Sequence, residues 1–390
     1  MLLVCCILSF ADLPILSDSP FMKYISEIDS IRAFACLMVM WDHLYSRFFL
    51  RIGDRELFTG GFIGVDVFFV LSGFLISSLL FQEKERSGRI RYGKFYVRRA
   101  LRLLPPIFTV VPLVLLPLIY YFDGAAVTIL NYFYLVTYTT VLPKFLEVTH
   151  RFPNPYWFPH AWSLSIEEAF YLVFPFLVGQ IQNLKRFSWS LLFFFFLNAC
   201  MMPYVLHKYQ GGAYHNPFWH FSQIGMGVWL AILVRSRSET NHQTTSGWYR
   251  RYTYLFFAAL AYVFAMFSFA TPGEQTRWFF MGGAPLLTLS ILVVLYGVVT
   301  GFLVPGVLKS KTLRFIGKIS YGLYLFHLPV YRLSERFLER SGMSPPAGSF
   351  LWLFVDIANV AIVFLLAILS WFLIERRILN YKERVWASAK

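Results

Sequence analysis

The sequence predicts an all-α protein, a polytopic bundle of about ten transmembrane helices. Of its 390 residues, 57% are hydrophobic and 14% are charged, and the mean hydropathy is +0.57. A soluble domain is about one quarter charged. Apolar segments recur from residue 30 to residue 374 with no long polar stretch between them. We therefore expect one integral membrane domain, residues 22–390, preceded by an N-terminal extension that we expect to be dispensable, residues 1–21.

Each expected span is close to the ~20 residues that an α-helix needs to cross a bilayer. The spans are 30–49, 61–81, 104–122, 162–182, 188–206, 217–234, 252–270, 278–300, 315–331 and 350–374. The apolar segment 125–142 breaks the alternation of loop charge if it is counted as a span, so we expect a re-entrant or surface helix there. The four cysteines have neither metal-ligand spacing nor the pattern of a disulfide framework, so we expect no metal site.

The lysines and arginines predict the orientation. With the N-terminus in the cytoplasm, the inner segments hold 25 of the 35 lysines and arginines, which is the excess that short cytoplasmic loops carry. Both termini are therefore expected to be cytoplasmic. Topology and anionic lipid account for the net charge of +14, so the expected partner is membrane lipid and not nucleic acid. No internal repeat is visible, which disfavours transporters built from duplicated halves.

The first span, "RAFACLMVMWDH", carries ionisable residues at both ends. Arg32 and His43 are 11 residues apart, and at ~100° per residue this is ~20° from three full turns, so both lie on one helix face. The rise between them is about 16 Å, which places His43 beyond the midplane if Arg32 lies at the inner boundary. Such a histidine is either a functional group facing the bundle or a neutral histidine bonded to a neighbouring helix, and its position favours neither.

The second span, "GGFIGVDVFFVLSGFLIS", places Asp66 ~8 Å below its outer end, a depth similar to that of His43. A carboxylate at this depth is costly unless it is paired, so we expect the two side chains to meet. The glycines of this span, together with Ser72, permit close approach of a ligand or of a neighbouring backbone. Helix packing is the more common reason for such glycines.

The fourth span begins with "FPHAWSLSIEEAFYLVFPF", which places His160 at the outer mouth. Glu167 and Glu168 follow about one and a half turns into the helix. Two adjacent side chains cannot face one way on a helix, so at most one of these carboxylates is expected to point inward. The alternative is an interfacial anchor, with Trp157 and Trp162 in the aromatic belt.

Two further segments carry charged or polar residues. In "KFYVRRALRLLPP", Arg98 and Arg102 share a helix face and Arg99 lies beside them. Guanidinium groups suit bidentate contact with phosphate, although a basic cluster here is more often an anchor on the cytoplasmic side. "ISYGLYLFHLPV" places His327 in the ninth span, where Pro329 frees a backbone carbonyl. A structural and a catalytic role for this histidine are equally open.

The ordered set of motifs resembles the acyltransferase 3 family of integral membrane acyltransferases, over residues 22 to about 375. The motifs are "EIDSIRAFACLMVMWDH", "GVDVFFVLSGFLIS", "FYVRRALRLLP", "HAWSLSIEEAFYLVFP", "ISYGLYLFHLP" and the closing "IERR". The chain departs from the family pattern at Ser30, where glycine is usual, and at Ala169, where glutamine is usual.

The resemblance implies an enzyme of the bacterial inner membrane that takes an acyl group, usually acetyl, from cytoplasmic acyl-CoA. The acceptor is a hydroxyl of a carbohydrate or glycolipid, such as lipopolysaccharide O-antigen or another envelope glycan. No permanently bound cofactor is expected, since acyl-CoA is the donor substrate. Together with the arguments above, the resemblance gives three sets of candidate residues. They are catalytic (His43, Asp66, Glu167, Glu168), donor-binding (Arg32, Ser72, Arg98, Arg99, Arg102) and substrate-site residues (His160, His327).

The expected chemistry agrees with these residue types. Acyl transfer needs the attacking hydroxyl to lose its proton, and imidazole, with an ordinary pKa near ~6.5, suits a general base. We therefore expect His43 to be the base and a carboxylate such as Asp66 or Glu167 to orient it. The alternative is a transporter or flippase for a glycolipid or acylated metabolite, in which buried charges line a pathway without acyl-CoA dependence. A membrane-embedded sensor explains neither the arginine cluster nor His43.

Overall fold

The structure is a computed structural model. It describes residues 24–45, 51–52, 55–56, 60–145, 155–209, 214–238, 282–301, 306–346 and 349–381. The expected span 252–270 and the extension 1–21 lie outside the described residues.

The described chain is helical apart from one short antiparallel pair of strands, which confirms the predicted all-α class. The α-helices are α2 (Ser26–Tyr45), α3 (Ile63–Ser87), α4 (Tyr92–Phe108), α5 (Leu116–Thr137), α6 (Val141–Phe145), α7 (Trp162–Gln180), α8 (Leu184–Tyr209), α9 (Pro217–Ser238), α12 (Ala284–Val299), α13 (Lys311–Arg340) and α14 (Leu351–Ser370). Short 3-10 or π segments are η2 (Gly60–Phe62), η3 (Val111–Leu115), η5 (Pro159–Ala161), η8 (Gly306–Lys309) and η9 (Trp371–Glu375), and the strands are β1 (Arg51–Ile52) and β2 (Arg55–Glu56).

Six helical stretches of the described chain are long and apolar enough to cross a membrane. They are Gly60–Ser87, Tyr92–Thr137, Pro159–Gln180, Leu184–Lys208, Pro217–Ser236 and Leu351–Tyr381. The helices α2 and α13 are not in this set because they carry more charged and polar residues. Both were expected to span the membrane, and much of their polar surface is buried against other helices.

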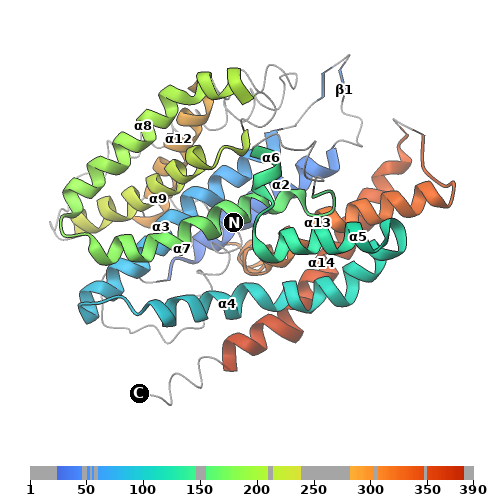
Figure 1. The fold of residues 1–390 in the computed structure, drawn as a ribbon, viewed down its shortest axis with the longest axis horizontal. Coiled ribbons are helices and arrows are strands. Elements are labelled where there is room, and N and C mark those ends of the chain that lie inside the picture. Colours follow the sequence, from blue (N-terminus) through green and yellow to red (C-terminus); the bar gives the residue numbers. More distant parts are fainter. Residues whose placement is uncertain are drawn as a thin grey trace.

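Two pairs of helices, α3 with α9 and α13 with α2, form the centre of the bundle. α3 packs against α9 and α2, while α13 packs against α2 and α14. α8 covers the outer side of α9, and α4 runs along one edge of the bundle (Figure 1). α2 and α13 therefore occupy the interior, where their polar side chains can meet protein instead of lipid.

The segment 125–142 was expected to be a re-entrant or surface helix. In the structure it follows a sharp turn of the α4–η3–α5 stretch at Gly124, whose φ is 77° and whose ψ is −179°. After this turn α5 runs back along the bundle toward α6 (Figure 1). Glycine permits the turn because this region of φ is disfavoured for residues with a Cβ.

Glycines set the separation of α3 from α9. A Cβ on Gly73 would collide with the carbonyl oxygen of Ile224, and one on Gly227 would collide with the carbonyl oxygen of Val70. On the other side of α3, Gly64 lies against the backbone of α2 in the same way. The packing interpretation of these glycines is confirmed.

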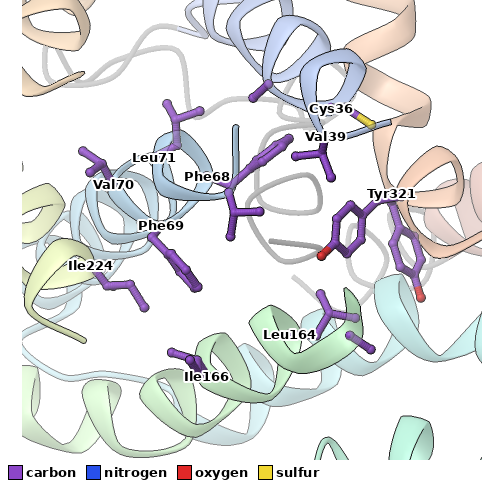
Figure 2. Close-up of a cluster of buried hydrophobic side chains, with 14 of the residues drawn as sticks. Cys36, Val39, Phe68, Phe69, Val70, Leu71, Leu164, Ile166, Ile224 and Tyr321 are labelled. Carbon is purple, nitrogen blue, oxygen red and sulfur yellow. The ribbon is translucent and has the colours of Figure 1, made fainter. Parts of the chain in front are cut away.

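Apolar side chains fill the space where α2, α3, α7 and α13 meet. Val39, Phe68, Phe69, Leu164 and Tyr321 are each at most 1% exposed, and Figure 2 shows them gathered between these helices. Along α2, this apolar layer lies between two groups of polar residues. One group is around Arg32, in the first half of the helix, and the other is around His43, near its end. The two groups form the candidate site.

Candidate active site

Several polar contacts join α2 to α13, and two of them involve the candidate residues Arg32 and His43. At the first, Nη2 of Arg32 donates to Oγ of Ser320 over 2.9 Å. At the second, Nε2 of His327 lies 3.2 Å from Nδ1 of His43. Both residues of the first span therefore face the same neighbouring helix, which confirms the prediction that they share one helix face.

The hydrogen bonds fix which nitrogen of each ring carries the proton. Nδ1 of His327 lies 2.6 Å from the carbonyl oxygen of Tyr324. A carbonyl only accepts, so Nδ1 of His327 is the donor and Nε2 of the neutral ring is an acceptor. Nδ1 of His43 faces that acceptor and also the carbonyl oxygen of Val39, at 2.9 Å, so Nδ1 of His43 carries the proton.

This arrangement leaves a lone pair on Nε2 of neutral His43. Among the residues that the structure describes, Nε2 of His43 has no hydrogen-bond partner. An imidazole whose Nδ1–H is held by other groups presents Nε2 as a base, which is the geometry of catalytic histidines in general.

A third histidine completes what we call the histidine cluster, His43, His160 and His327. The ring of His160 comes from η5 and lies 4.7 Å from that of His327, centroid to centroid. The backbone carbonyl of His160 accepts a hydrogen bond of 2.6 Å from the Tyr324 hydroxyl, which also lies 2.9 Å from Oγ of Ser163. The structure thus brings together the expected base and both candidate substrate-site residues, from α2, η5 and α13.

Two cations lie beside the histidine cluster. Lys144 of α6 and Arg332 of α13 interact electrostatically with His43 and with His160. Burial, and then the charge of Arg332, lower the pKa of Lys144 to about 8. The guanidinium carbon of Arg332 lies 4.1 Å from the centroid of the Tyr156 ring. The positive potential favours negative charge that develops at this end of the bundle.

Asp66 belongs to a different network from the one expected for it. Its Oδ1 accepts a hydrogen bond of 2.8 Å from Gln223, and its Oδ2 accepts one of 3.4 Å from the Tyr214 hydroxyl. The expected contact with His43 is therefore wrong, because His43 points toward α13 whereas Asp66 points toward α9. Similar depth in two helices does not determine the direction in which each side chain points.

The two adjacent glutamates of α7 differ in burial. Glu167 is fully buried. The Glu168 side chain is 23% exposed, and its Oε1 lies 3.5 Å from Nη2 of Arg99 on α4. Glu168 therefore lies against the arginine cluster, and the expectation that only one of the pair is deeply inward-facing fits this arrangement.

The three arginines of α4 differ in burial. Arg99 and Arg102 are 7% and 2% exposed, whereas Arg98 is half-buried. The buried face of α4 also includes Leu103 and Pro106, so Arg98 lies at its edge. The two arginines of α4 that face inward are therefore Arg99 and Arg102.

Both inward arginines contact aromatic rings. The guanidinium carbon of Arg99 lies 3.5 Å from the centroid of Tyr171, and that of Arg102 lies 5.1 Å from the centroid of Trp371. Arg102 also interacts electrostatically with Glu375. Such stacking is typical of guanidinium groups in partly desolvated sites.

Arg32 and Ser72, two further donor-site candidates, are both fully buried. Nη1 of Arg32 lies 3.0 Å from Oδ1 of Asp29, which also accepts a hydrogen bond from Tyr24. Asp29 interacts electrostatically with Arg102, so this group joins α2, α13 and α4. We call it the inner polar group, because the sequence predicts that it lies on the cytoplasmic side. The Ser72 hydroxyl has no hydrogen-bond partner in the described part of the chain, and no contact there links it to the arginines.

Comparison with known proteins identifies one family and several relatives. The sequence profile of the acyltransferase domain matches residues 25–376. A Bacillus subtilis (strain 168) protein named as a candidate peptidoglycan O-acetyltransferase, YrhL, is 31% identical over 328 residues, covering 80% of this chain and 49% of that protein. The O-acetyltransferase OatA of Staphylococcus aureus (strain NCTC 8325 / PS 47) is 26% identical over 346 residues, covering 79% and 51%.

The chain spans about half the length of the curated relatives it matches. No solved structure matches the sequence.

Proposed function

The chain belongs to the acyltransferase domain family, and from that premise we propose that it is a membrane O-acetyltransferase. It takes acetyl from acyl-CoA on the cytoplasmic side and transfers it to a hydroxyl of an extracytoplasmic carbohydrate. The observation that carries this proposal is His43, whose Nδ1–H faces two acceptors and whose Nε2 is left as a base. The acceptor class is an envelope glycan, which fits the acceptor in the name of the Bacillus relative.

The proposed reaction uses His43 as the proton carrier. The hydroxyl proton of the acceptor passes to Nε2 of His43 while the hydroxyl oxygen bonds to the acyl carbon. The carbon–sulfur bond of the thioester then breaks, and the proton on His43 is transferred to the leaving thiolate. His327 holds the Nδ1–H of His43 in place throughout and stabilises the orientation of the ring.

The function is tested by measuring ester-linked acetate on the envelope glycan of bacterial cells with and without the chain. Mild base releases such acetate, which is then quantified by chromatography. We expect a rise in released acetate that depends on the chain. Export of a glycan with unchanged acetate content would instead support the alternative function, a transporter or flippase.

The donor is proposed to bind beside α4. Coenzyme A carries three phosphate groups, and Arg98, Arg99 and Arg102 line this helix near the inner polar group. The half-buried Arg98 lies at the edge of the buried face, where a phosphate arriving from the cytoplasm meets it first. Arg99 and Arg102 extend the cationic surface inward.

Arg98→Gln is expected to weaken acetyl-CoA binding by about 1.5–3 kcal/mol, because one charge-assisted hydrogen bond is lost. Isothermal titration of the purified full chain with acetyl-CoA measures this change. Arg89→Gln, an exposed charge removal, is the matched control and should leave the affinity unchanged. If Arg98→Gln and wild type bind acetyl-CoA with equal affinity, the arginine cluster is a cytoplasmic anchor and not a donor site.

We propose ten spans with both termini in the cytoplasm, in the bacterial inner membrane. In a cysteine-free background, Met343→Cys, in the exposed turn between α13 and α14, should react with a membrane-impermeant maleimide in intact cells. Arg89→Cys, in the turn between α3 and α4, should react only after permeabilisation. The reverse labelling would move the donor site to the outside and contradict the proposed direction of transfer.

A further inference from the structure

His160 is buried in a way that sets it apart from other buried histidines. It is 3% exposed, and within the described residues neither of its ring nitrogens has a hydrogen-bond partner. His220, also fully buried, has a polar partner beside each ring nitrogen: Gln223 Oε1 lies at 2.7 Å and the carbonyl oxygen of Tyr214 at 2.7 Å. The two residues therefore represent a satisfied and an unsatisfied histidine in the same bundle.

An unsatisfied buried polar group costs free energy, because its hydrogen bonds to water are lost without replacement. Buried polar groups without partners are rare, and each calls for an explanation such as a catalytic role. An imidazole always carries at least one N–H, whether it is neutral or protonated. His160 therefore holds a hydrogen-bond donor inside the bundle that the described fold does not use.

The ring of His160 lies next to the proposed base. It contacts the ring of His327 edge to face, at 4.7 Å between centroids, and that of Tyr324 at 5.0 Å. His327 in turn contacts His43, and His160 interacts electrostatically with His43. The proposed base, His43, and the unused hydrogen-bond donor of His160 therefore belong to the same cluster.

The backbone of His160 is fixed from two sides. Its carbonyl accepts the hydrogen bond from Tyr324, and the Oγ of Ser163 lies 3.3 Å from the same carbonyl. Pro159 precedes it in η5, which removes one backbone donor and restricts the chain. The backbone that carries the ring is therefore held in place before substrate arrives, and the ring packs against those of His327 and Tyr324. Such preorganisation favours electrostatic stabilisation of a transition state.

We propose that His160 is a second catalytic residue, whose ring N–H donates a hydrogen bond to the carbonyl oxygen of the acyl group as negative charge develops on it. The proposal rests on the proposed function, in which the acceptor hydroxyl oxygen attacks that carbonyl carbon. During the attack the carbon–oxygen double bond becomes single and its electron pair moves to the oxygen, next to the N–H of His160. The pair returns when the carbon–sulfur bond breaks, and His160 itself neither gains nor loses a proton.

The surrounding charge supports this role. Lys144 and Arg332 interact electrostatically with His160, and neither charge forms part of the bond exchange. Their field stabilises negative charge on the acyl oxygen relative to the neutral ground state. The cluster thus combines a base, a donor and a positive potential at one place.

The test compares His160→Phe with His220→Phe in the purified full chain, using acetyl-CoA as donor and the envelope glycan of the host as acceptor. His160→Phe keeps a ring against His327 and Tyr324 but removes the N–H. We expect the turnover number to fall by ~10²- to 10³-fold, as for the loss of one oxyanion donor. The acetyl-CoA affinity should be unchanged, and the thermal unfolding midpoint should be equal to or above that of wild type, because an unsatisfied polar group is removed.

The control His220→Phe should give the opposite result, a lowered unfolding midpoint from loss of two buried hydrogen bonds. His160→Asn and His160→Gln place an amide N–H near the position of Nδ1 or Nε2, and at least one of them should exceed the turnover of His160→Phe by ~10-fold or more. That rescue is not expected of a residue that only packs.

The outcomes separate the two proposals. If the wild-type chain forms no base-labile glycan ester from acetyl-CoA, the proposed function fails. If wild type transfers and His43→Gln does not, but His160→Phe transfers at the wild-type rate, the role of His160 alone is overturned. A lowered unfolding midpoint of His160→Phe with no rescue by either amide would also overturn it, since this is the result for a structural histidine.

Discussion

His43→Gln is expected to fold, to bind acetyl-CoA with wild-type affinity and to lose acetyl transfer by ~10²- to 10⁴-fold, the usual cost of losing a general base. Glutamine keeps a hydrogen-bond donor that can face the Val39 carbonyl and His327, so the contacts of Nδ1 have a substitute. It has no group that takes up a proton near neutral pH. Transfer of labelled acetyl from acetyl-CoA to glycan, at matched expression, measures the loss.

The control for this variant is His207→Gln, an exposed histidine near the end of α8, which should transfer at the wild-type rate. Retained transfer in His43→Gln would show that His43 is a packed polar residue. The base would then have to be sought at His327 or at Glu167, which is fully buried in α7.

Asp29→Leu is expected to lower the free energy of unfolding by about 3–5 kcal/mol, because it removes the carboxylate that pairs with the buried Arg32 guanidinium. The two side chains are 1% and 0% exposed, and they lie 3.0 Å apart. Ser320 supplies a neutral contact to Arg32 and carries no charge that could replace the Asp29 carboxylate. Thermal unfolding of the purified chain in detergent, followed by tryptophan fluorescence, measures the change.

The double variant Asp29→Leu/Arg32→Met provides the matched control. Removing both partners of a buried ion pair is often neutral or stabilising, so the double variant should unfold at a higher temperature than Asp29→Leu alone. A single variant as stable as wild type would contradict the description of Asp29 and Arg32 as an ion pair that supports the inner polar group.

The sequence predicted the helical architecture and one helix face correctly. The composition and the recurrence of apolar segments predicted the fold class, since both depend on the solvent in which the chain folds. The spacing of Arg32 and His43 placed them on one face because helix rotation per residue is fixed, and the structure shows both facing α13.

The relation between helices could not be derived from spacing. Asp66 has the expected depth, but its side chain bonds Gln223 of α9 and not His43. The partner of His43 is His327, which lies 284 residues away in the sequence. Helix periodicity gives directions relative to each helix's own axis, whereas the rotation of one helix against another depends on packing, here on the glycine contacts of α3.

The cluster around His160 was only partly visible in the sequence. His160 and His327 were each identified as candidates, but their contact through Tyr324 joins two distant segments. Lys144 and Arg332 were not identified, because single cations near the ends of helices are common and give no distinctive pattern. The position of Arg332 shortly after His327 on the same helix was the one local signal available.

The central claim is that acetyl passes from the cytoplasmic arginine cluster to a hydroxyl at the opposite, histidine-bearing end of the bundle. Inside-out membrane vesicles that contain the full chain and enclose glycan test this directly when acetyl-labelled CoA is added outside. We expect base-labile label on the enclosed glycan with the wild-type chain and almost none with His43→Gln. Enclosed glycan that stays unlabelled with the wild-type chain, while the same vesicles label it after permeabilisation, would contradict transfer across the bilayer.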